Sequence, residues 1–248
     1  MRVLLKATAL LLTDSTSTMA KVIHFTRHAQ AEHNVDEDYF IPDAPLTPLG
    51  RSISRQAEEL YSQTAELQQS ADLLVTSPLK RTLQTTIIGY RGLRARLESQ
   101  NSPKPIVVLS RLQEVNDFPC DTGSSRNELE QIDEFAGINF ESLEDDWNSK
   151  QGDFSPSSDA VKARARWVRR WLRDRPEQNI VVVAHGDILR KITKTSLYEP
   201  WANAEVRKFT FMHDNDDEAK LVSLPAETEA RAGGEEPTSG EFKFNHWS

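Results

Sequence analysis

The sequence contains a single cysteine, and no apolar run approaches the roughly 20 residues needed to span a bilayer. One cysteine, Cys120, excludes an intramolecular disulfide and any four-thiolate zinc site. A surplus of basic residues is also missing, because 30 Lys and Arg face 38 Asp and Glu, for a net charge of −8. Proteins that bind the nucleic-acid backbone normally carry a positive excess, so the composition disfavours nucleic acid as the partner. We expect neither a membrane protein nor a secreted disulfide scaffold.

The remaining composition is that of an ordinary globular protein, with 38% hydrophobic and 27% charged residues among 248. Residues 1–20 begin with a basic, leucine-rich stretch that weakly resembles a signal peptide, although Lys6 interrupts its apolar run. We interpret them as an N-terminal extension and favour a cytoplasmic protein, with secretion as the alternative. Residues 225–248 are poor in apolar side chains, which predicts a flexible C-terminal tail.

Short apolar runs alternate with helical patterns along the rest of the chain. The predicted strands are 21–26, 71–76, 105–109 and 180–184, and the predicted helices are 48–61, 81–90, 159–172 and 187–195. Continuous apolar runs suit strands that helices cover on both faces. The sequence therefore predicts an α/β fold, a three-layer sandwich with a mainly parallel sheet. On the helix over 159–172 we expect the arginines to face solvent and Trp167 and Trp171 to pack inward.

A polar segment over about residues 117–159 interrupts this alternation and predicts a small helical cap insertion. Its aromatic side chains allow two interpretations: contact with an apolar part of a substrate, or packing within the cap itself, which we favour. These residues are Phe118, Phe135, Phe140, Trp147 and Phe154.

Ionisable side chains follow three of the predicted strands at the point where each strand ends. The first strand leads into Arg27 and His28, the second into the helix that carries Arg81, and the last into His185. In a parallel sheet such ends meet at one crevice. Guanidinium groups match phosphoryl oxygens, and neutral imidazole can act as a nucleophile. The pattern indicates a site for a phosphorylated ligand.

Around these residues the sequence resembles the histidine phosphatase superfamily, the phosphoglycerate mutase-like proteins. Residues 25–34 (FTRHAQAEHN) resemble its signature. Four further motifs follow in the order the family has them: 45–50 (PLTPLG), 77–85 (SPLKRTLQT), 112–114 (LQE) and 183–186 (VAHG). The resemblance spans about residues 21–224, which we therefore expect to form the catalytic domain, and five ordered motifs make it specific.

The resemblance implies a role for each matching residue. His28 would attack phosphorus and become a phosphohistidine, Glu114 would act as proton donor and then as base, and His185 would hold the phosphoryl group. The other phosphate ligands that the resemblance implies are Arg27, Asn34 and Arg81. The family uses no metal and no nucleotide, so we expect no cofactor. His33 beside Asn34 either contacts substrate or faces solvent.

Two departures bear on the expected activity. Ala29 and Ala31 replace the glycine and the hydroxyl residue that the signature often has. The tyrosine- and glycine-containing stretch that follows the glutamate in cofactor-dependent mutases is missing after Glu114. The stretch CDTG at 120–123 instead resembles a fungal phosphomutase-like branch.

The sequence therefore predicts a histidine acid-type phosphatase that hydrolyses a small phosphorylated metabolite without a metal. A phosphomutase that uses the same phosphohistidine is the first alternative. An inactive protein that binds phosphorylated ligands is the second. The identity of the substrate and the oligomeric state stay open.

Overall fold

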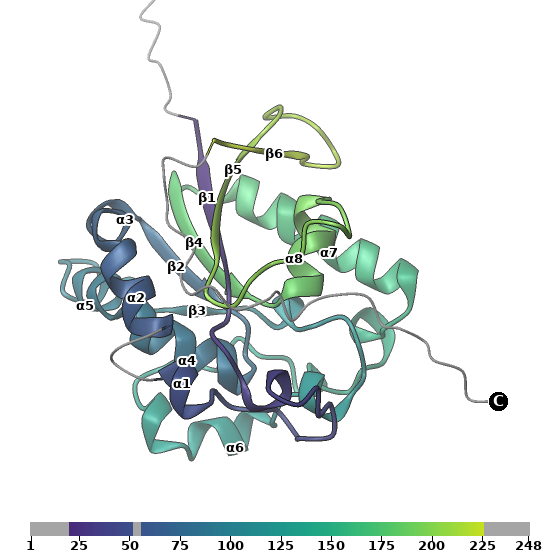
Figure 1. Ribbon diagram of the computed structural model, residues 1–248. Coiled ribbons are helices and arrows are strands. Elements are labelled where there is room, and N and C mark those ends of the chain that lie inside the picture. The colour runs from purple at the N-terminus through teal and green to yellow at the C-terminus, as the bar shows by residue number, and fades with distance from the viewer. Residues whose placement is uncertain (1–19, 52–55, 226–248) are drawn as a thin grey trace, which may run out of the picture.

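The computed structural model describes residues 20–51 and 56–225 (Figure 1). The predicted N-terminal extension and C-terminal tail therefore lie, but for one residue each, outside the described residues. A single mixed sheet has the order β3-β2-β4-β1-β5-β6. Its strands are β1 (Val22–Arg27), β2 (Leu73–Thr76), β3 (Val107–Val108), β4 (Asn179–Ala184), β5 (Val206–Phe211) and β6 (Leu221–Ser223).

Four strands are parallel and form the part of the sheet that the sequence predicted. β1 and β2 both pair in parallel with β4, and β3 pairs in parallel with β2. β5 and β6 run antiparallel on the far side of β1 and were not predicted. The mainly parallel sheet is confirmed.

Helices cover both faces of this sheet, as the three-layer prediction requires (Figure 1). On one face lie α2 (Gln56–Gln63), α3 (Ala65–Ser70), α4 (Lys80–Gly89) and α5 (Arg91–Glu98); on the other lie α7 (Ser158–Asp174) and α8 (Gly186–Thr193). A four-residue helix, α1 (Pro48–Arg51), begins the predicted helix over 48–61. Within the described residues, no helix is both long and apolar enough to cross a membrane.

Strand β4 shows why its sequence is apolar without alternation. Ile180, Val182 and Ala184 pack toward α7 and α8, whereas Val181 and Val183 pack toward α4 and α5. All five side chains are fully buried, because each face of the central strand has a helical layer over it.

Helix α7 differs from its prediction. Trp167 is 38% exposed rather than packed inward, and its ring stacks on that of Trp171 with 6.3 Å between centroids. Conversely, Arg164 and Arg169 are buried although arginines were expected to face solvent. Arg169 pairs with Glu218 beyond β5, a partner that helical periodicity cannot reveal.

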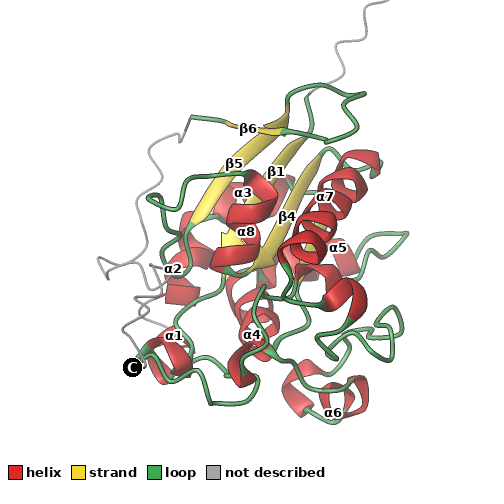
Figure 2. Ribbon diagram, turned by 90° about the vertical axis from the view of Figure 1, so that its right-hand side faces the viewer, coloured by secondary structure: helices red, strands yellow, loops and turns green. Residues whose placement is uncertain are grey.

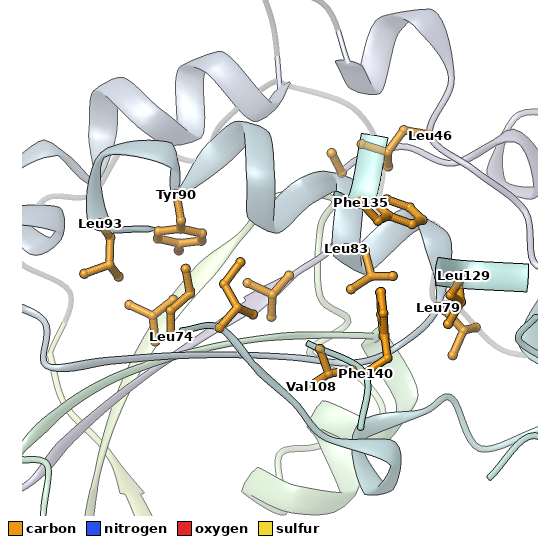
Figure 3. Packing of buried hydrophobic residues seen from close by; sticks show 14 of the residues in the cluster. Leu46, Leu74, Leu79, Leu83, Tyr90, Leu93, Val108, Leu129, Phe135 and Phe140 are labelled. Carbon is orange, nitrogen blue, oxygen red and sulfur yellow. The ribbon is translucent and has the colours of Figure 1, made fainter. Parts of the chain in front are cut away.

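The insertion between β3 and α7 is helical only in part. Among the residues described there, α6 (Arg126–Glu130) is the α-helix, and the remainder consists of short 3-10 turns and irregular chain (Figures 1 and 2). Its Phe135 and Phe140 pack with Leu83 of α4 in one continuous core (Figure 3). The aromatic residues are packed rather than open to substrate, as we favoured, but they pack into the core shared with α4 and the sheet and not within the insertion alone.

One glycine shows how tightly the insertion is packed. A Cβ on Gly123 would lie 2.0 Å from the Trp147 ring, so this position accepts no larger residue without displacement of the indole. Phe118 is the exception among the aromatic residues: it is half-buried and packs against Tyr39, with ring centroids 5.5 Å apart.

Candidate active site

The register of the sheet brings the two motif histidines together. Arg27 of β1 lies opposite Ala184 of β4, and each is followed directly by a histidine. The backbone N–H of His28 donates to the Ala184 carbonyl at 2.9 Å. As a result the rings of His28 and His185 lie 5.3 Å apart between centroids, and both side chains are buried.

Arg81 lies between the two histidines. It is the second residue of α4 and only 1% exposed. Its Nε–H donates to His28 Nε2 at 3.3 Å and to His185 Nδ1 at 3.1 Å. Three residues predicted from separate motifs therefore contact one another at the carboxyl ends of β1, β2 and β4.

The hydrogen bonds of His28 determine where its proton lies. Nδ1 is 2.7 Å from the Ala29 carbonyl oxygen, which can only accept, so Nδ1 carries the hydrogen. Burial, together with the positive charges of Arg81 and Arg27, holds the pKa of His28 well below its ordinary value. The ring is neutral at physiological pH, and Nε2 presents a lone pair to the site.

His185 is neutral for the same reasons, with the opposite tautomer. Burial and the neighbouring Arg81 lower its pKa. Nδ1 accepts from Arg81, and Nε2 therefore donates to the hydroxyl of Ser77 at 2.8 Å. Ser77 follows β2 directly, so a third strand end orients this ring.

Arg27 and Asn34 complete the predicted set. Arg27 is 3% exposed and donates to the Trp201 carbonyl at 2.6 Å. Burial lowers its pKa to about 10, so it stays charged at neutral pH. The Asn34 carbonyl oxygen accepts the backbone N–H of Ala31 at 3.0 Å, which orients the amide in the loop after β1.

Glu114 caps the helix that follows His185. Its Oε1 accepts the N–H of Ile188 at 2.9 Å, and Oε2 accepts that of Asp187 at 3.2 Å. Burial and the negative charges of Asp187 and Asp121 raise the pKa of Glu114 to about 7. A carboxyl group with this pKa can both give and take a proton near neutral pH. Three other glutamates of the insertion are exposed and therefore poorer candidates for this role: Glu128, Glu130 and Glu141.

Two cationic side chains that were not predicted as site residues donate hydrogen bonds to the backbone carbonyl of this glutamate. Lys150 Nζ and Arg164 Nη2 each donate to the Glu114 carbonyl at 3.3 Å. Burial lowers the pKa of Lys150 to about 8 and that of Arg164 to about 10. Both come from segments distant in sequence, and neither belongs to a motif.

The residue that orients Arg81 was also missed. Arg81 Nη2 pairs with Asp121 Oδ1 at 2.9 Å, with both side chains buried, and Nη1 donates to the Cys120 carbonyl at 2.5 Å. The CDTG stretch, singled out only for its resemblance, thus anchors the guanidinium group. Burial raises the pKa of the Cys120 thiol to about 12, so this cysteine is a packed, protonated residue.

We expect Asp121→Ala to lower the free energy of unfolding by about 3–5 kcal/mol, because it leaves the buried Arg81 charge without its partner. Asp121→Asn keeps the shape but not the charge, and misplacement of Arg81 should reduce kcat/KM on the order of 10²-fold. Chemical denaturation and steady-state kinetics measure the two effects. The exposed Asp117→Asn serves as control. Unchanged kinetics of a folded Asp121→Asn variant would contradict the role.

The fold is a three-layer α/β sandwich, and two neutral histidines and two buried arginines lie together at the carboxyl ends of its parallel strands. The family model of the histidine phosphatase superfamily (branch 1) matches residues 23–217, and the chain belongs to this superfamily.

Curated relatives agree with this assignment. A phosphoglycerate mutase-like protein of Arabidopsis thaliana is 31% identical over 203 residues, which cover 68% of this chain and 72% of that protein. A "probable phosphatase" of Schizosaccharomyces pombe is 27% identical over 205 residues, which cover 81% of this chain and 90% of that protein. These relatives come from a plant and a yeast, and membership of a particular fungal branch stays a prediction.

Solved structures share the fold at low identity. A mycobacterial hydrolase superposes with a TM-score of 0.52 at 18% identity, covering 87% of this chain and 94% of that chain. A mycobacterial glucosyl-3-phosphoglycerate phosphatase in complex with inorganic phosphate superposes with a TM-score of 0.51 at 17% identity, covering 83% and 96%.

Proposed function

We propose that this protein hydrolyses the phosphomonoester of a small metabolite through a phosphohistidine formed on His28. The observation that carries the proposal is the neutral His28, whose Nε2 lone pair lies beside the buried Arg81 and a second neutral histidine, His185. The stretch of cofactor-dependent mutases that is missing after Glu114 favours hydrolysis over mutase chemistry, and one relative is named a probable phosphatase. The side chains that carry this chemistry lie within the proposed catalytic domain, residues 21–224.

In the first half-reaction the lone pair of His28 Nε2 forms a bond to phosphorus while the bond from phosphorus to the leaving oxygen breaks. Arg27 and Arg81 offset the charge on the equatorial oxygens, and Asn34 donates a hydrogen bond to them. His185 also donates in this step, with its hydrogen moved to Nδ1 and the Ser77 hydroxyl donating to Nε2. Arg81 Nε turns from the histidines to the phosphoryl group in this step. Protonated Glu114 gives its hydrogen to the leaving oxygen, and the product alcohol departs.

In the second half-reaction water replaces the alcohol. Ionised Glu114 takes a proton from the water as its oxygen bonds to phosphorus, and the electrons of the N–P bond return to His28. Inorganic phosphate leaves, and Glu114 is protonated again. Each group ends in the state in which it began.

The direct test of the function is release of inorganic phosphate from a panel of sugar, glycerate, nucleotide and prenyl phosphates by the purified chain. Hydrolysis of at least one member at a rate that depends on His28 supports the proposal. Transfer of the phosphoryl group to a second metabolite without phosphate release would favour a mutase. Ligand binding with neither reaction would favour a binding protein.

Chelation should leave the rate unchanged, because arginine side chains rather than a cation neutralise the transferred group. We expect activity in excess EDTA to equal that in buffer alone. Vanadate, which adopts the five-coordinate geometry of in-line transfer, should inhibit competitively. Activity that EDTA abolishes and Mg²⁺ restores would contradict the proposed mechanism.

We propose that this reaction takes place in the cytoplasm, because a chain with one cysteine lacks the intramolecular disulfides on which small secreted domains often depend. Fractionation of cells that express the full chain tests this: recovery in the medium would contradict it.

A further inference from the structure

A third histidine lies in the centre that the two motif histidines form. His33 belongs to the 3-10 turn Glu32–Asn34, which follows β1. Its ring centroid is 5.8 Å from that of His28. The side chain is 7% exposed. Burial, with the nearby charges of Arg81 and Arg27, lowers the pKa of His33 to about 2. It is therefore neutral at any pH at which the protein works, with one N–H group and one lone pair.

The neighbouring amide decides which nitrogen carries that hydrogen. The Asn34 carbonyl oxygen accepts from the Ala31 N–H at 3.0 Å and from Asn203 Nδ2 at 3.4 Å. The amide nitrogen of Asn34 therefore faces His33 Nε2, at 3.0 Å. Because an amide nitrogen can only donate, His33 Nε2 accepts, and the hydrogen of the neutral ring lies on Nδ1.

This N–H group has no acceptor among the residues that the structure describes, although it is buried. A buried donor without an acceptor is destabilising, and such a group calls for a specific explanation. The charged groups that act on it most strongly, Arg81 and Arg27, are themselves donors. The unsatisfied N–H of His33 therefore lies close to two positively charged groups, an environment that an oxyanion satisfies.

We propose that His33 Nδ1–H donates a hydrogen bond to an oxygen of the phosphoryl group that His28 attacks. This inference rests on the proposed function and extends it: the centre contains three histidines, with His33 as a neutral donor. A neutral donor can bind the phosphoryl oxygen without adding another positive charge beside His28. The lone pair of His28 Nε2 therefore stays available to attack phosphorus. Its contribution does not change with pH.

Two substitutions separate this role from a structural one. The amide nitrogen of asparagine occupies about the place of histidine Nδ1, whereas the end of glutamine reaches about the place of Nε2. His33→Asn therefore keeps a donor toward the phosphoryl group and loses the contact with Asn34. His33→Gln keeps the contact with Asn34 and loses the donor.

The probe is inorganic phosphate, and its dissociation constant is measured by calorimetry on the full chain, without turnover. We expect His33→Gln to weaken phosphate binding about tenfold and to raise KM similarly, whereas His33→Asn stays within about threefold of the parent. The opposite order would show that His33 acts by holding Asn34 and would overturn the proposal. Equal affinities in all three proteins would overturn it as well.

A spectroscopic measurement keeps the proposal testable should either variant fold poorly. With ¹⁵N-labelled histidine, the parent protein should show a hydrogen on Nδ1 of His33 whose resonance shifts when phosphate is added. His24, buried at the start of β1 about 13 Å along the strand from His28, is the internal control and should not respond. A His33 resonance that phosphate leaves unchanged, in a protein that binds phosphate, contradicts the donor role alone. Absence of both phosphate binding and turnover in the parent contradicts the proposed function too.

Discussion

His28→Ala should abolish turnover while the protein stays folded. Loss of the nucleophile removes the covalent step altogether, and in enzymes with such a nucleophile the loss amounts to about 10³-fold or more in kcat. The fold should survive because His28 contributes no side chain to either apolar core cluster. The measurement is phosphate release by the purified variant, with circular dichroism to verify folding.

Covalent labelling provides the second readout for this variant. The parent protein, mixed with ³²P-labelled substrate and quenched, should carry an acid-labile, base-stable label that mass spectrometry places on His28. The exposed His213→Ala is the matched control and should label as the parent does. Hydrolysis by folded His28→Ala at a rate near that of the parent would exclude the mechanism.

The central strands and the residues at their ends were predictable because local sequence specifies them. Buried parallel strands produce continuous apolar runs, and the carboxyl ends of neighbouring parallel strands meet at one edge. From this alone His28, Arg81 and His185 were expected in one crevice, and the structure brings them into contact. β5 was not predicted because its sequence, VRKFTF, shows no clear alternation of apolar and polar residues. Most of its side chains are half-buried, and two of them are charged.

The partners of these residues were not predictable, because they depend on the path of irregular chain. Asp121 pairs with Arg81 across 40 residues, from a segment of 3-10 turns that has no periodicity to indicate which side chains point inward. Lys150 reaches the Glu114 carbonyl from the same irregular insertion, 36 residues away. Arg164 reaches it from α7, 50 residues away, where helical periodicity does not reveal a polar partner for a buried arginine. Motifs thus identify the groups that we propose to contact substrate, whereas the groups that orient them are recognised only in the packed structure.

Glu114→Gln should affect substrates unequally. An alkyl phosphate expels a poor leaving group that needs a proton, so its kcat/KM should fall about 10²- to 10⁴-fold. An aryl phosphate such as p-nitrophenyl phosphate releases its oxygen with little help, and phosphorylation of the enzyme should be slowed much less. Single-turnover phosphoenzyme formation on both substrates measures the difference, with the exposed Glu128→Gln as control. Equal losses on both substrates would assign the proton to another residue.

The pH dependence of the parent protein tests the same residue without mutation. Because the pKa of Glu114 is raised to about 7, its carboxyl group is protonated below that pH and ionised above it. kcat/KM for the alkyl phosphate should therefore fall as the pH rises through about 7. His28, whose pKa is well below its ordinary value, stays neutral throughout.

Two variants assign this descending limb. Asp187 is the strongest of the negative charges that raise the pKa of Glu114, so Asp187→Asn should move the midpoint to lower pH. In Glu114→Gln the descending limb should be absent. A limb that persists there with an unchanged midpoint would belong to a different acid.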